Sequence, residues 1–185
     1  RIAARMGVTP NMVTAVGAAL CVLATFFFLQ GWYWTGLAPG LVFMVLDTVD
    51  GKLARCTITS SWWGNVFDLG RDLIHPPFWW YAWGAGLALY GRPMDAGLFW
   101  AVLAVLVGGY VAQRLIEGGF IGLFKMHVHV WRRFDSRFRL VTARRNPNMV
   151  ILFVSLLFQR PDIGFIAIAV WTLLSLAVHL VQLLQ

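Results

Sequence analysis

Long apolar segments make up most of this sequence, and short stretches rich in polar residues, glycine or proline separate them. Of the 185 residues, 59% are hydrophobic and 12% are charged. A soluble domain would carry about twice that charged fraction. In a bilayer the backbone must satisfy its own polar groups, and a chain of such segments does so by forming helices. The sequence therefore predicts an all-α, polytopic membrane protein.

Turn-forming residues mark the ends of the predicted helices. Thr9-Pro10-Asn11 is a typical helix start, with Thr9 as the N-cap and Pro10 as the first helical residue. Pro76 and Pro77 fall inside the third helix, which they should kink or interrupt. After a short interfacial segment, Arg1–Val8, we expect six transmembrane helices, at about Asn11–Leu29, Leu37–Asp50, Gly64–Leu89, Ala96–Ile116, Pro147–Phe158 and Ile163–Leu184.

The predicted connections between these helices are short, with one exception. A basic stretch with interleaved aromatic residues follows Gly118-Gly119, which we expect to end the fourth helix. The fifth helix is short unless it begins before Pro147. The remaining connections are an aromatic interfacial turn, a polar connection and two tight turns, at Gly31–Gly40, Gly51–Trp63, Tyr90–Asp95 and Gln159–Asp162.

Carboxylates are concentrated at one place in this apolar chain. Four of its 8 acidic residues lie within residues 47–72, namely Asp47, Asp50, Asp68 and Asp72. A carboxylate at membrane depth is costly, and such residues are therefore functional candidates. The spacings i, i+3 and i, i+4 put each pair on one helix face. If the two helices run antiparallel, the four carboxylates can converge and, as hard oxygen ligands, hold divalent cations, most simply two.

The same stretch resembles the signature of a known family. It contains a set of eight residues at fixed spacing: Asp47, Asp50, Gly51, Ala54, Arg55, Gly64, Asp68 and Asp72. This set is similar, without departure in residue type or spacing, to the motif of the CDP-alcohol phosphotransferases (CDP-alcohol phosphatidyltransferases). The resemblance implies an integral membrane enzyme that transfers a substituted phosphoryl group from a CDP-alcohol to a second alcohol and releases CMP. It also implies a homodimer packed through transmembrane helices.

The resemblance assigns roles to the motif residues. The four aspartates would hold two divalent ions, Mg²⁺ or Mn²⁺, that clamp the diphosphate, and Asp72 would also be the catalytic base. Gly51, Ala54 and Gly64 would lie where a larger side chain collides with the nucleotide. The residues implied to bind CDP are Asp50, Gly51, Ala54, Arg55, Gly64 and Asp68.

Three further positions have two interpretations each. Asn11 and Thr14 resemble the family's first-helix start and are candidate cytidine contacts, although they could equally cap the helix. His75 follows Asp72 by three residues on the same face. It could support the site or contact the acceptor, or it could be a structural histidine.

Basic residues are distributed unequally between the two sides of the predicted membrane protein. The net charge is +7, and of the 15 Lys and Arg residues only Arg92 and Arg160 fall on the side of the fourth-helix start. By the positive-inside rule, the other side, with the aspartates and both termini, is cytoplasmic. In a bacterium the membrane would be the inner membrane. No motif supports nucleic-acid binding.

The basic stretch near the fifth helix also has two interpretations. Its arginines could attract anionic lipid headgroups. Alternatively, some of them could bind an anionic or phosphorylated acceptor. Our candidates for acceptor binding are Arg114, Arg144, Arg145 and Asn146, together with His75.

The sequence leaves the substrates open. CDP-diacylglycerol could donate a phosphatidyl group to a second alcohol such as a phosphorylated polyol, in phospholipid biosynthesis. A soluble CDP-alcohol could instead donate its head group to a lipid alcohol or polyol. A divalent-cation transporter is the alternative from another class, but it has no use for Gly51, Ala54, Arg55 and Gly64 at these spacings. We expect a single membrane domain over residues 1–185, in a chain that starts at Arg1 and can be a fragment of a longer protein.

Overall fold

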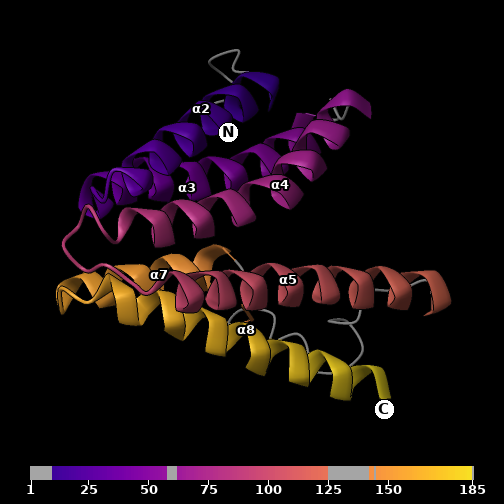
Figure 1. Ribbon diagram of the computed structural model, residues 1–185. Coiled ribbons are helices and arrows are strands. Elements are labelled where there is room, and N and C mark those ends of the chain that lie inside the picture. Colours follow the sequence, from indigo (N-terminus) through magenta and orange to yellow (C-terminus); the bar gives the residue numbers. More distant parts are fainter. Residues whose placement is uncertain (1–9, 58–61, 125–141, 144, 185) are drawn as a thin grey trace. The chain divides into compact units, whose positions relative to one another are not determined.

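The computed structural model describes residues 10–57, 62–124, 142–143 and 145–184. Within these ranges it describes every side chain except those of residues 10–11, 50–57, 62–72, 123–124, 145 and 183–184. Every regular element in this part of the chain is a helix, as the sequence predicted. The six helices are α2 (Pro10–Leu29), α3 (Tyr33–Thr57), α4 (Trp62–Gly86), α5 (Ala96–Phe124), α7 (Arg145–Leu157) and α8 (Pro161–Leu184) (Figure 1). The contacts divide the chain into two compact units, residues 1–91 and 92–185.

Three of the described helices are long and apolar enough to cross a membrane. The segments that meet this criterion are Met12–Leu29, Ala96–Gly122 and Pro161–Gln182. Shorter apolar helices cover Tyr33–Val49 and Asn146–Leu157. The protein is therefore an integral membrane protein. That all six helices span the bilayer stays a prediction.

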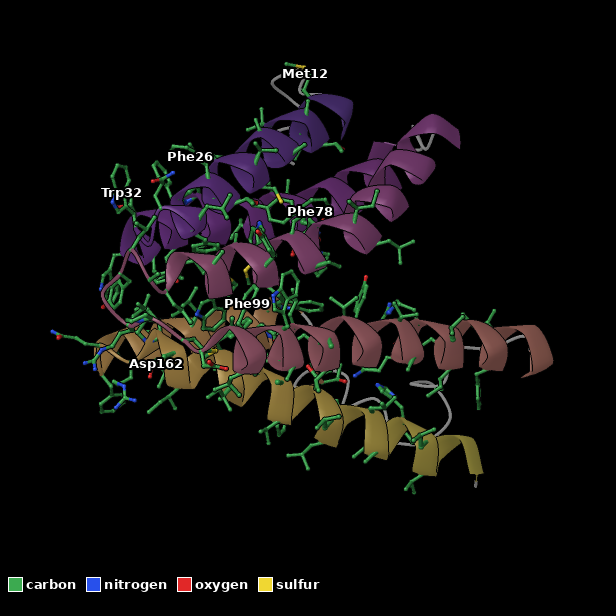
Figure 2. All side chains as sticks on the ribbon, viewed as in Figure 1. Met12, Phe26, Trp32, Phe78, Phe99 and Asp162 are labelled. Carbon is green, nitrogen blue, oxygen red and sulfur yellow. The ribbon has the colours of Figure 1, made fainter. Side chains whose placement is uncertain are left out.

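In the first unit, α2 and α3 form an antiparallel pair joined by a tight turn. Gly31 has a φ of 73°, and the Trp32 N–H donates to the Phe27 carbonyl at 2.9 Å. The expected turn over Gly31–Gly40 is thus too long, since α3 already begins at Tyr33 and contains Pro39. Its first turns are fixed by packing: Tyr33 is fully buried and its hydroxyl donates to the Trp83 carbonyl of α4. Trp32, labelled in Figure 2, lies exposed in the turn.

The end of α4 packs closely on the turn between α2 and α3. A Cβ atom on Gly86 would lie 1.9 Å from the Phe28 carbonyl oxygen, so only glycine fits there. One face of α4 also contacts α2, because the Trp79 indole N–H donates to the Cys21 carbonyl at 3.3 Å. Trp79 meets Phe28 edge-to-face, with 5.6 Å between ring centroids. Aromatic side chains thus form the core of this unit.

Two expected boundaries around the motif are wrong. The polar connection was expected over Gly51–Trp63, but α3 continues to Thr57 and α4 begins at Trp62. The third helix was expected to extend to Leu89, whereas α4 ends at Gly86. Apolar periodicity does not reveal helical turns that carry a polar motif, and this is why the extension of α3 was missed.

The helix α4 also continues through Pro76 and Pro77, and no interruption occurs there. Each proline removes one backbone donor, a loss that membrane helices tolerate. Residues on both sides of the pair, His75, Trp79 and Trp80, are buried and hold the helix in place.

In the second unit, α8 packs against both α5 and α7. The helix α5 passes through Gly118-Gly119 to Phe124, so its expected end at Ile116 is wrong. Phe120, which is 3% exposed, anchors the continuation. The helix α7 begins at Arg145, two residues before its expected start at Pro147, which lies in its first turn, and with 13 residues it is still short. Asp162, at the start of α8 (Figure 2), forms an ion pair with Arg160 at 2.8 Å.

Candidate active site

The motif residues fall on two helices of the first unit. Positions 47, 50, 51 and 54 lie in the C-terminal half of α3, and positions 64, 68 and 72 lie in the N-terminal half of α4. The α3 positions follow the spacing i, i+3, i+4, i+7, so they share one helix face. The α4 positions follow i, i+4, i+8 and also share a face. The structure thus bears out the helical placement of both aspartate pairs.

An aromatic contact fixes how these two faces meet. Phe43 lies one turn before Asp47 on the same face of α3, and its ring contacts His75 of α4 with centroids 5.3 Å apart. Phe43 also meets Trp79, one turn further along α4, at 5.8 Å. His75 and Trp79 are on the α4 face that carries positions 64, 68 and 72. The motif face of α3 is therefore turned toward the motif face of α4.

The same contact sets the register between the helices, which run antiparallel. Starting from Phe43 and His75, one turn along each helix leads to positions 47 and 72. Positions 50 and 68 lie about 10 Å from Phe43 and His75 along their helices, and positions 54 and 64 lie about 16 Å from them. Each aspartate position on α3 thus has an aspartate position of α4 at its own level, and the small residues 54 and 64 come last.

His75 is part of a packed layer between α3 and α4 that adjoins motif positions 47 and 72. It is 7% exposed, and its ring meets those of Phe43 and Trp79 nearly at right angles, at 83° and 79°. Phe43 itself is fully buried. The layer of Phe43, His75 and Trp79 is therefore closely packed, and it supports the helical turns that carry positions 47 and 72 from below.

Of the four aspartate side chains, the structure describes that of Asp47, which is half-buried. The side chains of Asp50, Gly51, Ala54, Arg55, Gly64, Asp68 and Asp72 lie outside the described part. Among the side chains that are described, no group of three His, Cys, Asp or Glu residues could hold a metal. The metal site therefore stays a prediction. The backbone positions fit it, because they bring four carboxylate-bearing residues to facing helix surfaces.

The start of α2 lies at the same end of the first unit as the motif, because α2 and α3 are antiparallel. Pro10 is its first helical residue, as predicted. Thr14 is half-buried. Thr9 and the Asn11 side chain are outside the described residues, so the two interpretations of Asn11 and Thr14 both remain.

The predicted acceptor residues other than His75 belong to the second unit. Arg114 contacts Glu117 on α5 at 3.0 Å and lies over the Tyr110 ring at 5.5 Å. Asn146 is exposed in the first turn of α7. The Arg144 and Arg145 side chains, and most of the basic stretch, lie outside the described part.

Sequence reasoning missed a row of buried polar residues on α8. Thr172, Ser175 and His179 are at most 6% exposed. His179 lies 3.3 Å from the Thr142 hydroxyl, and Ser175 accepts the Ala143 N–H at 2.9 Å. Gln113 of α5 donates to the Thr172 carbonyl at 3.3 Å. The spacing i, i+3, i+7 in an apolar helix was the signal that could have revealed this row.

The fold and the motif define a helical membrane protein with a carboxylate motif on two facing helices. The sequence model of the family described as CDP-alcohol phosphatidyltransferase matches residues 7–181. This chain belongs to that family.

The relatives include two inositol phosphate lipid synthases and a cholinephosphotransferase. A phosphatidylinositol phosphate synthase of Cutibacterium acnes is 35% identical over 101 residues, 54% of this chain and 47% of the relative. An archaetidylinositol phosphate synthase of Pyrococcus horikoshii is 26% identical over 170 residues, 90% of this chain and 79% of the relative. Cholinephosphotransferase 1 of Danio rerio is 27% identical over 159 residues, 78% of this chain and 37% of the relative. The chain thus spans about half of the first relative and a smaller part of the third.

Proposed function

We propose that this protein transfers a phosphatidyl group from CDP-diacylglycerol to a phosphorylated polyol and releases CMP. The observation that carries the proposal is the Phe43–His75 contact, which turns the two halves of the family motif toward each other. The names of two relatives, both inositol phosphate lipid synthases, support the choice of acceptor.

In this proposal the four aspartates converge between α3 and α4 and hold two divalent ions, Mg²⁺ or Mn²⁺. The donor set fits, since carboxylate oxygens are the ligands such ions prefer. When bound, the ions neutralise charge on the diphosphate. Positions 54 and 64 carry small residues at the far level of the two faces, and with Gly51 they leave room for the nucleotide. Arg55 binds phosphate, and Asn11 and Thr14 contact the cytidine.

The reaction is a displacement at the β-phosphorus of the donor. The acceptor hydroxyl oxygen forms a new bond to this phosphorus, and the bond from phosphorus to the bridging oxygen breaks, so that CMP leaves with that oxygen. Asp72 accepts the hydroxyl proton. His75 supports the turn that carries Asp72. Arg114, Arg144, Arg145 and Asn146 are proposed to hold the acceptor and its phosphate, for which guanidinium groups are well suited.

Head-group transfer from a soluble CDP-alcohol to a lipid alcohol is the second candidate. The similarity to a cholinephosphotransferase favours it. Both candidates use the same carboxylates, and they differ in which substrate carries the lipid tails.

We also propose that the motif faces the cytoplasm and that the protein acts as a homodimer. The charge asymmetry supports the orientation, since Arg92 and Arg160 alone lie on the opposite side. The dimer rests on the family resemblance and is tested by the mass of the detergent-solubilised protein.

The first prediction concerns Asp72. Purified protein should release CMP from a CDP-alcohol and an acceptor when Mg²⁺ or Mn²⁺ is present, and a chelator should abolish the reaction. Asp72→Asn should lower kcat by at least about 100-fold, because it removes both the base and a metal ligand. The measurement is CMP release with a panel of CDP-alcohols and polyol phosphates.

Asp95→Asn is the matched control for this substitution. Asp95 Oδ2 accepts the Leu98 N–H at 3.1 Å as the N-cap of α5, and asparagine caps equally well. The Asp95→Asn variant should release CMP at the wild-type rate. If no pair of substrates releases CMP while cations cross liposomes in an Asp68-dependent way, the protein is a transporter and the proposal is wrong.

A further inference from the structure

The two residues described just before α7, Thr142 and Ala143, are hydrogen-bonded to α8. The Ala143 N–H donates to Ser175 Oγ at 2.9 Å, and the Thr142 hydroxyl lies 3.3 Å from His179 Nε2. Ser175 lies inside the apolar span Pro161–Gln182, and α8 continues to Leu184. The segment that leads into α7 therefore contacts α8 about 14 Å before that helix ends.

Hydrogen bonds fix this arrangement. His179 Nδ1 lies 3.0 Å from Gln182 Oε1. An amide oxygen can only accept, so Nδ1 donates and Nε2 is left to accept the Thr142 hydroxyl proton. Thr142 and Ser175 are at most 1% exposed. The residues just before α7 are therefore held against the apolar span of α8.

Asn148 lies one turn into α7 and is an exception among its buried polar neighbours. It is 5% exposed, and within the described part of the chain neither its amide nitrogen nor its amide oxygen has a hydrogen-bond partner. Ser155, two turns later on α7, donates to the Leu152 carbonyl at 2.8 Å. A buried amide with both polar atoms unsatisfied destabilises the protein. Such a group is expected where a ligand supplies the missing partners.

The surroundings of Asn148 indicate which ligand this is. Asn148 lies one turn after the start of α7, next to the first turn, where backbone N–H groups lack helical partners. Asn148 also follows Arg145 by three residues and shares its helix face. A side-chain amide both donates and accepts, which matches a hydroxyl group rather than a phosphate. The phosphate is the natural ligand of the arginine and the helix N-terminus.

We propose that Asn148 binds a hydroxyl group of the phosphorylated polyol acceptor and is a specificity residue for it. This assignment rests on the proposed function and adds a residue that the sequence did not indicate. In the absence of acceptor, the unsatisfied amide of Asn148 destabilises the protein. With acceptor bound, its amide donates to one hydroxyl oxygen and accepts from a hydroxyl proton.

The test uses Asn148→Leu, which keeps the branched shape and the number of heavy atoms and removes both polar atoms. Without ligand, its thermal unfolding midpoint in detergent should rise by about 2–4 °C, because an unsatisfied buried amide has been removed. The KM for inositol 1-phosphate or glycerol 3-phosphate should rise about tenfold while the KM for CDP-diacylglycerol stays unchanged. In wild-type protein at least one of these two phosphates should raise the midpoint, and Asn148→Leu should lose that response.

Ser155→Ala is the matched control on the same helix, since it removes a buried hydroxyl that already has a partner. It should lower the midpoint slightly and change neither KM. A lower midpoint in Asn148→Leu would show that the amide is satisfied by water or protein and would overturn the assignment. So would an unchanged acceptor KM, a raised donor KM, or a wild-type midpoint that neither phosphate raises. If no substrate pair releases CMP, the proposed function fails, but the thermal measurement still decides the role of Asn148.

Discussion

At the residue scale, single glycines decide how closely the helices of the first unit approach. Gly86 lies against the backbone of α2, where even a methyl group would meet the Phe28 carbonyl oxygen at 1.9 Å. A backbone atom cannot move aside as the end of a flexible side chain can. Other glycines have no such role: a Cβ atom at Gly108 of α5 would have no neighbour within 4 Å. The sequence alone does not separate these two kinds of glycine.

Gly86→Ala should therefore destabilise the protein by about 2 kcal/mol or more, because α4 must shift away from α2. Gly108→Ala, the control, should be neutral or stabilise the protein by up to about 1 kcal/mol through its better helix propensity. Thermal unfolding in detergent measures both. Equal effects of the two substitutions would contradict the close packing at Gly86.

At the element scale, the sequence predicted the six helices of the described part of the chain and, through the spacing of the aspartates, the two faces that carry the motif. It could not predict that α3 extends to Thr57, since the polar motif has no apolar periodicity there. Nor could it predict the rotation of α3 against α4. That rotation depends on which large side chains pack together, and Phe43 was one of several phenylalanines with no distinguishing local signal. Asn148 was missed because its significance lies in the absence of a partner, which only coordinates can show.

If the Phe43 contact sets the register of the motif, Phe43→Leu should lower CMP release by about 10- to 100-fold, since a misplacement of about 1 Å can cost this much. The unfolding midpoint should fall modestly, because some buried area and ring contacts are lost. Phe165→Leu is the control: Phe165 is also fully buried, stacks on Phe99 (labelled in Figure 2) in the second unit, and should lose similar stability without loss of activity. If both variants keep full activity, the aromatic layer does not position the motif.

At the scale of the whole molecule, two compact units share one family match that runs over residues 7–181. The aspartate motif belongs to the first unit, and Asn148 with the polar row of α8 belongs to the second. The helix over Ala96–Gly122 is long and apolar enough to cross a membrane, and a crossing would put Arg92 and Gly122 on opposite sides. Its direction through the membrane then gives the orientation of the protein.

Single cysteines at Arg92 and Gly122 measure that direction, in a background where Cys21 and Cys56 are replaced by alanine. A membrane-impermeant maleimide added to intact cells should label Arg92→Cys, because the positive-inside rule places this turn outside. Gly122→Cys should be labelled only after the cells are permeabilised. The reverse pattern would place the aspartate motif on the outer face and contradict the proposed access to cytoplasmic substrates.

The shortness of α7 has a consequence for the backbone just before it. Its 13 residues make a helix about 20 Å long, about 10 Å less than the hydrocarbon core of a bilayer. The neighbouring α8 has the length of a full span, and the two helices are joined by a tight turn at one end, so the whole deficit falls where Thr142 meets His179. Lipid tails cannot hydrogen-bond a polar backbone, and here residues 142 and 143 are buried against α8, whose Ser175 accepts the Ala143 N–H. The polar side chains of α8 thus take the place of water for the chain end that α7 is too short to carry to the membrane surface.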